Sequence, residues 1–260
     1  MGRLNEGWRI QSRVISALLV RELTTRFGRE NIGFLWLMLE PLLFAGLVAL
    51  MWRIGRGSEE HGVSIVLFVI SGYIPLTLFR HGIGRSISIF VANGSLMYHR
   101  QIKLLDFVLV RFIIEVIGCM LAFTFIATAL YFAGVTDPPA SMGHLLAGWF
   151  LYCLFTLSLC LLIAPLSEMS EVLEKILPVA TYLIIPFSGT FNMVSWLAPS
   201  VRDFMLWSPP VNAMELIRYG LFGERVTPHF DVSVPLTFSM VCSLIGLILC
   251  RRVRRTLVVE

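Results

Sequence analysis

The chain has 260 residues, 57% of them hydrophobic and 15% charged, with a mean hydropathy of +0.79. A soluble domain carries about 25% charged residues, so this composition excludes an ordinary soluble protein and indicates a surface that mostly faces lipid. The net charge of +4 is concentrated in arginines at both ends of the chain. Short basic flanks of apolar runs are typical of the cytoplasmic side of a membrane.

The arginine clusters at the two ends have a competing interpretation, nucleic-acid binding, but membrane orientation already accounts for both of them. They comprise Arg3, Arg9, Arg13, Arg21, Arg26 and Arg29 at one end and Arg251, Arg252, Arg254 and Arg255 at the other. The first apolar run starts near residue 34 and is too long for the core of a signal peptide. We therefore expect the protein to keep this run as a membrane anchor.

Residues 8–27 are predicted to form an amphipathic helix that lies in the membrane interface. The predicted apolar stripe consists of Trp8, Ile15, Leu18, Leu19 and Leu23. Arginines on the opposite side complete the pattern of a helix among lipid headgroups. The alternative is an ordinary cytoplasmic helix packed on a partner. In either case residues 1–33 form a cytoplasmic region, followed by a transmembrane domain over 34–250 and a basic cytoplasmic tail over 251–260.

The first predicted span covers residues 34–52 and contains Glu40 directly before Pro41. An ionisable residue inside an apolar run is costly and usually faces protein or a water-filled path. The alternative is that Glu40 lies near the cytoplasmic headgroups, only about two turns into the span. Pro41 is expected to kink the helix, and residues 53–62 to form a short polar loop.

Five further apolar runs predict an all-α integral membrane protein with six transmembrane helices. These runs cover residues 63–81, 106–134, 144–164, 176–195 and 233–250. The third span carries Arg111 and Glu115, which are spaced to pair with each other on one helix face. The fifth is interrupted by Pro178, Pro186 and Gly189. Such interruptions are tolerated only where neighbours or a cavity satisfy the freed backbone groups.

Residues 196–232 form the longest segment predicted to lie outside, too polar for a full span. Ser208 is predicted to be the N-cap of a short helix with Pro209 at its first position. Gly223 would end this helix. Helices of this half length can enter the membrane and return, so we predict short re-entrant helices between spans five and six.

Six spans put both termini on the same side of the membrane, and the arginine-rich ends place that side in the cytoplasm. One feature opposes this topology. Arg202, Arg218 and Arg225 fall in the segment predicted to lie outside. If that segment lay inside, the number of spans would have to change.

The sequence lacks the motifs of several enzyme classes. It has no phosphate-binding Gly-x-x-x-x-Gly-Lys-Ser/Thr motif, and neither a Gly-x-Ser-x-Gly elbow nor a His-Glu-x-x-His pair. Ser71 is the nearest candidate for an intramembrane nucleophile, with no histidine obviously placed to serve it. The five cysteines are interpreted as packing residues, and the histidines show no metal-ligand spacing. We therefore predict no catalytic residues and no metal site.

Transport is the remaining class. The chain holds 19 Phe, 6 Trp and 6 Tyr, most of which are expected to pack against lipid or other helices or to sit in interface belts. A minority can line a path, because aromatic faces stack on sugar rings while polar groups bind the hydroxyls. The candidate path residues are Trp36, Glu40, Phe44, Tyr73, Asn192 and Trp207.

Four stretches of the chain resemble the KpsM-type membrane permease subunits of bacterial capsule-polysaccharide ABC exporters. They are Arg21-Glu22 with Arg26-Phe27-Gly28, then Gly33-Phe34-Leu35-Trp36 and Leu39-Glu40-Pro41; Leu96 to Lys103; Glu168 to Pro178; and Trp207-Ser208-Pro209-Pro210 with Glu215-Leu216 and Arg218. The resemblance covers essentially the whole chain. It implies a permease in the bacterial inner membrane that moves lipid-linked polysaccharide outward.

The resemblance also implies partners. Two copies of the chain would form the channel, and two copies of a separate cytoplasmic ATPase would bind the ATP and magnesium, so that this chain needs no cofactor of its own. A periplasmic co-polymerase and an outer-membrane channel would complete the system, with no role for nucleic acid. The residues implied to contact the ATPase are Arg21, Glu22, Arg26, Met97, Tyr98 and Arg100.

Two alternatives stay open from the sequence. Permeases for O-antigen and teichoic acid share the same plan, so the substrate is less well specified than the family. A secondary transporter that works without an ATPase would need charges along several spans for ion coupling. Here Glu40 and Glu115 are the only acidic candidates, both close to the predicted cytoplasmic side.

Overall fold

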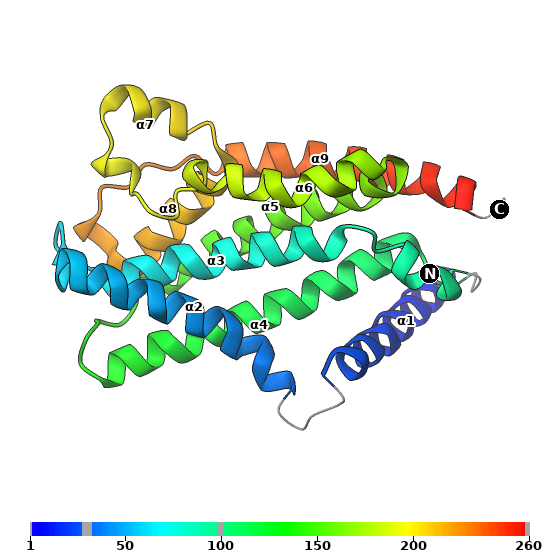
Figure 1. The fold of residues 1–260 in the computed structure, drawn as a ribbon, viewed down its shortest axis with the longest axis horizontal. Helices are drawn as coiled ribbons and strands as arrows, with labels where there is room; N and C mark the ends of the chain where they lie inside the picture. Colours follow the sequence, from blue (N-terminus) through cyan, green and yellow to red (C-terminus); the bar gives the residue numbers. More distant parts are fainter. Residues whose placement is uncertain (1, 28–32, 98–100, 258–260) are drawn as a thin grey trace.

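The structure, a computed structural model, describes residues 2–27, 33–97 and 101–257, which form an elongated bundle of helices (Figure 1). The longer helices are α1 (Gly2–Phe27), α2 (Gly33–Arg56), α3 (Ile65–Ser86), α4 (Leu104–Phe132), α5 (Met142–Met169), α6 (Glu171–Leu183), α8 (Pro209–Phe222) and α9 (Ser233–Leu257). The shorter ones are α7 (Pro199–Met205) and the 3-10 turns η1 (Val91–Leu96), η2 (Ile185–Phe187), η3 (Val194–Trp196) and η4 (Gly223–Arg225).

Five helices in the described ranges are long and apolar enough to cross a membrane. They lie at Met38–Arg56, Ile65–Ser86, Leu104–Phe132, Met142–Met169 and Ser233–Arg254. This agrees with the predicted all-α membrane protein. The predicted span over 176–195 is not one continuous helix, because α6 has 13 residues and ends at Leu183. A full span needs about 20 residues, and the turn η2 that follows α6 contains Pro186.

The connection between α2 and α3 is shorter than predicted. Instead of a polar loop from residue 53, α2 continues to Arg56, with Pro41 inside it. A hairpin of two antiparallel strands follows, β1 (Glu59–Glu60) and β2 (Val63–Ser64). Gly62 in the turn between them has φ +77°, a conformation that favours glycine.

The helices differ in how deeply they lie in the protein. In the most apolar stretch of α3, 83% of the residues are buried, against 17% for α2. α3 therefore forms the centre of the bundle, and most of α2 faces outward. α5 and α8 approach so closely that a Cβ on Gly220 would lie 2.3 Å from the backbone nitrogen of Leu145, and a Cβ on Gly148 would lie 2.6 Å from that of Ile217.

The predicted amphipathic helix over 8–27 exists as α1, but its apolar stripe faces the protein. Leu18 is only 7% exposed, and Ile15, Leu19 and Leu23 pack against the same core. Trp8 does not share this face, since 77% of its surface is exposed. The sequence pattern could not tell a stripe that packs on the chain itself from one that faces lipid.

The predicted boundaries of α8 are confirmed. The helix follows Ser208, begins at Pro209 and ends at Gly223, whose φ is +59°. The Ser208 hydroxyl does not cap α8 and instead donates a hydrogen bond to the carbonyl of Phe187. α7 and α8 lie at the same end of the bundle as the hairpin, whereas the start of α1 and the end of α9 lie together at the other end (Figure 1).

Candidate functional site

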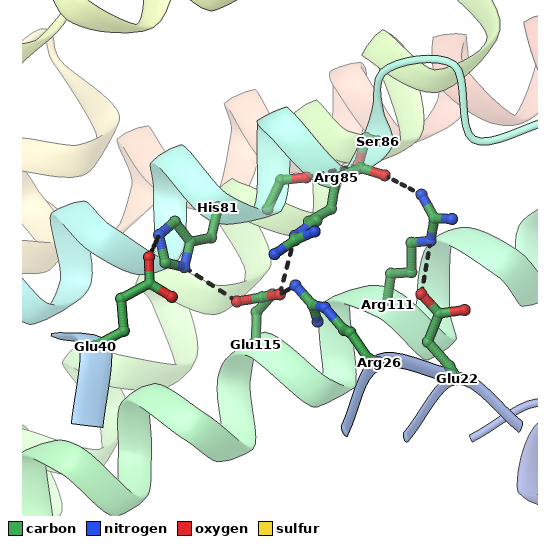
Figure 2. Close-up of polar contacts among 9 residues, drawn as sticks. Glu22, Arg26, Glu40, His81, Arg85, Ser86, Arg111 and Glu115 are labelled. Carbon is green, nitrogen blue, oxygen red and sulfur yellow. Dashed lines mark hydrogen bonds and ion pairs between the residues drawn. The ribbon is translucent and has the colours of Figure 1, made fainter. Parts of the chain in front are cut away.

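A buried carboxylate on α4 gathers charged side chains from other helices (Figure 2). Glu115 is 2% exposed. Its Oε1 accepts a hydrogen bond of 2.6 Å from Arg26 on α1 and lies 3.7 Å from Nε of Arg85 on α3. Its Oε2 lies 3.2 Å from Nδ1 of His81, also on α3. A carboxylate buried this deeply needs such partners, because an unpaired buried charge is strongly destabilising.

His81 extends this group to α2. Its Nε2 lies 3.5 Å from Oε1 of Glu40, while its other ring nitrogen faces Glu115. We call the five residues Arg26, Glu40, His81, Arg85 and Glu115 the Glu115 cluster. Glu40 thus faces another helix of the protein, and its position relative to the lipid headgroups stays a prediction. About 42% of its side chain is still exposed.

The predicted pairing of Arg111 with Glu115 within α4 is wrong. Arg111 instead lies 3.2 Å from Glu22 on α1 and donates a hydrogen bond of 2.9 Å to the backbone carbonyl of Arg85. Spacing along one helix shows only which side chains can reach each other. In the folded chain, α1 and α3 supply the cationic partners of Glu115, and Glu22 on α1 supplies the carboxylate that pairs with Arg111.

Of the six residues implied to contact an ATPase, Glu22 and Arg26 lie next to the Glu115 cluster or in it. Glu22 and Arg26 pair with α4 as described, and Arg21 donates a hydrogen bond of 3.2 Å to Asn93 in η1. Met97 packs partly against the core. Tyr98 and Arg100 lie outside the described residues. Contact with an ATPase stays a prediction for all six.

Three of the candidate path residues lie on α2. Trp36, Glu40 and Phe44 follow one another at intervals of four residues, which places them on one face of the helix. Trp36 is 54% exposed and Phe44 is 55% exposed. Glu40 also contacts His81 on α3, so this face of α2 joins exposed aromatic rings to the Glu115 cluster.

The other three candidate path residues are spread over the rest of the bundle. Tyr73 is half-buried on α3. Asn192 precedes η3, and Trp207 follows α7 with 81% of its surface exposed. A role for these residues in a substrate path stays a prediction.

A second polar cluster surrounds Arg218 on α8. This side chain is completely buried. Its guanidinium donates hydrogen bonds of 2.7 Å to the carbonyls of Gly189 and Thr190 and one of 3.0 Å to that of Asn192, and it lies 4.2 Å from the centre of the Phe68 ring. The expectation that neighbours satisfy the interrupted backbone near Gly189 is thereby confirmed. Arg218, whose charge opposed the predicted topology, therefore binds the backbone of the chain after α6, and we call this group of contacts the Arg218 anchor.

Glu215 and Gly72 complete this anchor. The Glu215 carboxylate lies 3.7 Å from Arg218 and accepts a hydrogen bond of 3.1 Å from the backbone nitrogen of Val194. On α3, a Cβ added to Gly72 would lie 2.5 Å from the carbonyl oxygen of Thr190. The chain after α6 is thus held from both sides, by α8 and by α3.

The junction between α8 and α9 is also held by polar contacts. The backbone nitrogen of Asp231 donates a hydrogen bond of 2.6 Å to the side chain of Asn212. Hydrogen bonds from the side chain and the backbone of Ser233 hold the pKa of Asp231 below its usual value. The start of α9 is therefore fixed to α8.

From the sequence, Arg85 was noted only as a charge after span two, and neither it nor His81 was predicted to belong to a functional site. A usable signal was present: Glu40 and Glu115 lie in apolar runs, and buried carboxylates require cationic partners. Both missed residues lie on the last turns of α3, beyond or at the end of the predicted span. Ser71, the nearest candidate nucleophile, donates a hydrogen bond of 2.8 Å to the carbonyl of Phe68 in its own helix.

Comparison of the sequence with known proteins shows which family the chain resembles. Residues 13–222 match the ABC-2 type transporter family. The chain is 38% identical to the capsule polysaccharide export inner-membrane protein CtrC of Neisseria meningitidis serogroup B, over 93% of this chain and 91% of that protein. It is 34% identical to the protein of the same description, BexB, of Haemophilus influenzae over the same shares. Identity to the polysialic acid transport protein KpsM of Escherichia coli is 24%, over 94% of this chain and 95% of KpsM.

Proposed function

Because the chain belongs to the ABC-2 type transporter family, we propose that it is the membrane-spanning subunit of an ATP-driven exporter. Its substrate is a lipid-linked capsular polysaccharide, which it moves outward across the bacterial inner membrane. The observation that carries this proposal is the similarity to CtrC and BexB, which extends over 93% of the chain. Both relatives are described as capsule polysaccharide export inner-membrane proteins.

In this proposal the chain crosses the membrane six times with both termini in the cytoplasm. α6 together with the chain after it makes the fifth crossing, α9 makes the sixth, and α7 and α8 are re-entrant. Two observations support the topology. The start of α1 and the end of α9 lie at the same end of the bundle (Figure 1). Arginines are also concentrated in both terminal segments, as expected of the cytoplasmic side.

The exporter is completed by other subunits. Two copies of this chain form the path, and two copies of a separate ATPase bind ATP and magnesium and dock near α1 and η1. A periplasmic co-polymerase and an outer-membrane channel carry the polymer onward. The outward-facing apolar side of α2 supports a second copy as a neighbour, because 54% to 56% of the surface of Leu43, Phe44 and Leu47 is exposed in the single chain.

The proposal is tested by deleting the gene in its native bacterium and restoring it on a plasmid. We expect the deletion strain to lose surface capsule and to accumulate the polymer inside the cell, and the plasmid to restore export. Normal surface capsule in the deletion strain would contradict the function. Loss of another surface glycan, such as O-antigen or teichoic acid, with intact capsule would contradict the assigned substrate while keeping the transporter class.

A further inference from the structure

We propose that Glu115 and His81 are positioning residues that transmit movement of α1 to the path-lining face of α2. The contact chain runs from Arg26 through Glu115 and His81 to Glu40, with one residue on each of α1, α4, α3 and α2. This inference rests on the proposed function, in which α1 lies next to the ATPase and α2 lines the path. The Glu115 cluster would then couple movement of α1 at the ATPase to the position of α2 at the path.

The geometry makes the chain continuous. Arg26 and Glu115 are joined at 2.6 Å, Glu115 and His81 at 3.2 Å, and His81 and Glu40 at 3.5 Å (Figure 2). Each contact crosses from one helix to another. A displacement of α1 therefore reaches α2 through three side-chain contacts.

Burial makes the contact between Arg26 and Glu115 stiff, whereas the contact between His81 and Glu40 is partly exposed. The side chains of Glu115 and Arg26 are only 3% and 16% exposed, so water can replace little of what they lose if they separate. Breaking one partner from a buried ion pair is strongly unfavourable. Movement of α1 is then expected to carry Glu115 and its partners along or to break the contact completely, and not to stretch it gradually.

His81 is suited to join two carboxylates. Its Nδ1 faces Glu115 and its Nε2 faces Glu40. Only the imidazolium form carries a proton on both nitrogens, so in that form His81 donates to both carboxylates at once. The charged groups around it are Glu40 on α2, Glu115 on α4, and Arg85 and Arg26 from α3 and α1.

The position of the cluster adds a reason for its use. α2 is the least buried of the five candidate spans, with 17% of its most apolar stretch buried. Because most of α2 faces outward, its position depends on the contacts of its inner face, and the one between Glu40 and His81 is among them. Its neighbour α3 is 83% buried in the corresponding stretch and serves as the fixed support.

The test uses the full complex of this chain with its ATPase in lipid nanodiscs and in cells. His81→Phe keeps an aromatic ring but removes both ring nitrogens, and it leaves the contact between Arg26 and Glu115 in place. The matched control is Gln11→Ala, which removes another hydrogen bond between α1 and α4, the one from Gln11 to Asp106, without touching the chain of contacts. Assembly of the complex, ATP turnover and polysaccharide export are measured for each variant.

We expect His81→Phe to assemble with its ATPase and to hydrolyse ATP within about twofold of wild type, while export falls at least about fivefold, the lower end of typical coupling between sites. Gln11→Ala should export normally. Normal export by His81→Phe, or an equal loss in Gln11→Ala, would overturn the inference.

A distance measurement separates failure of this inference from failure of the proposed function. Spin labels at Val20 on α1 and Leu47 on α2, both exposed, are compared in a background that lacks the native cysteines. The distribution of distances should broaden in His81→Phe and stay narrow in Gln11→Ala. If the wild-type complex exports no polysaccharide, the proposed function is wrong. If the distances in His81→Phe equal those of the wild type, the connection between α1 and α2 is refuted, whatever the outcome for export.

Discussion

Replacing Arg218 with leucine tests how the interrupted backbone after α6 is stabilised. The substitution removes three hydrogen bonds to the carbonyls of Gly189, Thr190 and Asn192. It also leaves the buried carboxylate of Glu215 without its cationic neighbour, which lies 3.7 Å away. Leucine fills part of the space but satisfies none of these groups.

The expected magnitude follows from these contacts. A hydrogen bond that involves a charged group contributes about 1.5–3 kcal/mol, and removing one partner of a buried ion pair costs about 3–5 kcal/mol. The two effects overlap, so we expect Arg218→Leu to lower the free energy of unfolding by about 4–6 kcal/mol. That is a large part of the about 5–15 kcal/mol that stabilises a typical folded protein.

The assay measures unfolding of the purified chain in detergent. Folded protein is quantified by size-exclusion chromatography after heating, and a separate titration uses a denaturing detergent. The matched control is Arg225→Gln, which breaks an exposed pair with Asp137 and should cost only about 0–1 kcal/mol. The unfolding midpoint of Arg218→Lys should lie between those of Arg218→Leu and Arg225→Gln. An ammonium keeps the positive charge but lacks the planar guanidinium that reaches several carbonyls at once. A midpoint for Arg218→Leu equal to that of Arg225→Gln would refute the proposed anchor.

Three further predictions follow from the packing, the path and the topology. Gly220→Ala should lower the free energy of unfolding by about 1–3 kcal/mol, because its Cβ would meet the backbone of α5. Gly46→Ala has open space around it and should be neutral or stabilising by up to about 1 kcal/mol. Equal unfolding midpoints for the two variants would contradict the close approach of α5 and α8. Trp36→Ala and Glu40→Ala should each lower surface capsule several-fold with normal membrane insertion, and normal capsule in both would exclude them from the path. A cysteine at Asp137 should react with an impermeant reagent added outside the inner membrane, while a tag at the C-terminus should stay protected in intact cells; the opposite pattern would reverse the topology.

Much of the helical plan could be predicted from the sequence because apolar runs and their punctuation are local signals. The limits of α8 followed from Ser208, Pro209 and Gly223, and the structure has them where predicted. The interruption near Pro186 was also visible. A local pattern does not give the degree of burial. The apolar runs of α2 and α3 look alike in the sequence, although α2 lies at the surface of the bundle and α3 at its centre.

The polar contacts were harder to predict because their partners are far apart in the sequence. Glu115 could reach Arg111 along its own helix, yet it binds Arg26, which lies 89 residues away. Arg218 bonds to carbonyls 26 to 29 residues earlier, in a segment whose path no periodicity describes. For Glu115 the spacing predicted an ionic partner but the wrong one, and for Arg218 the sequence predicted no contact; the fold determined both sets of partners.

We propose that this chain forms the membrane path and that a separate polypeptide supplies the energy for export. The most direct test is ATP turnover by the tagged chain purified from native membranes, before and after removal of any ATPase that comes with it. The account predicts that an ATPase co-purifies, that turnover depends on it, and that the remaining chain hydrolyses no ATP. Undiminished ATP hydrolysis by the chain alone would contradict it.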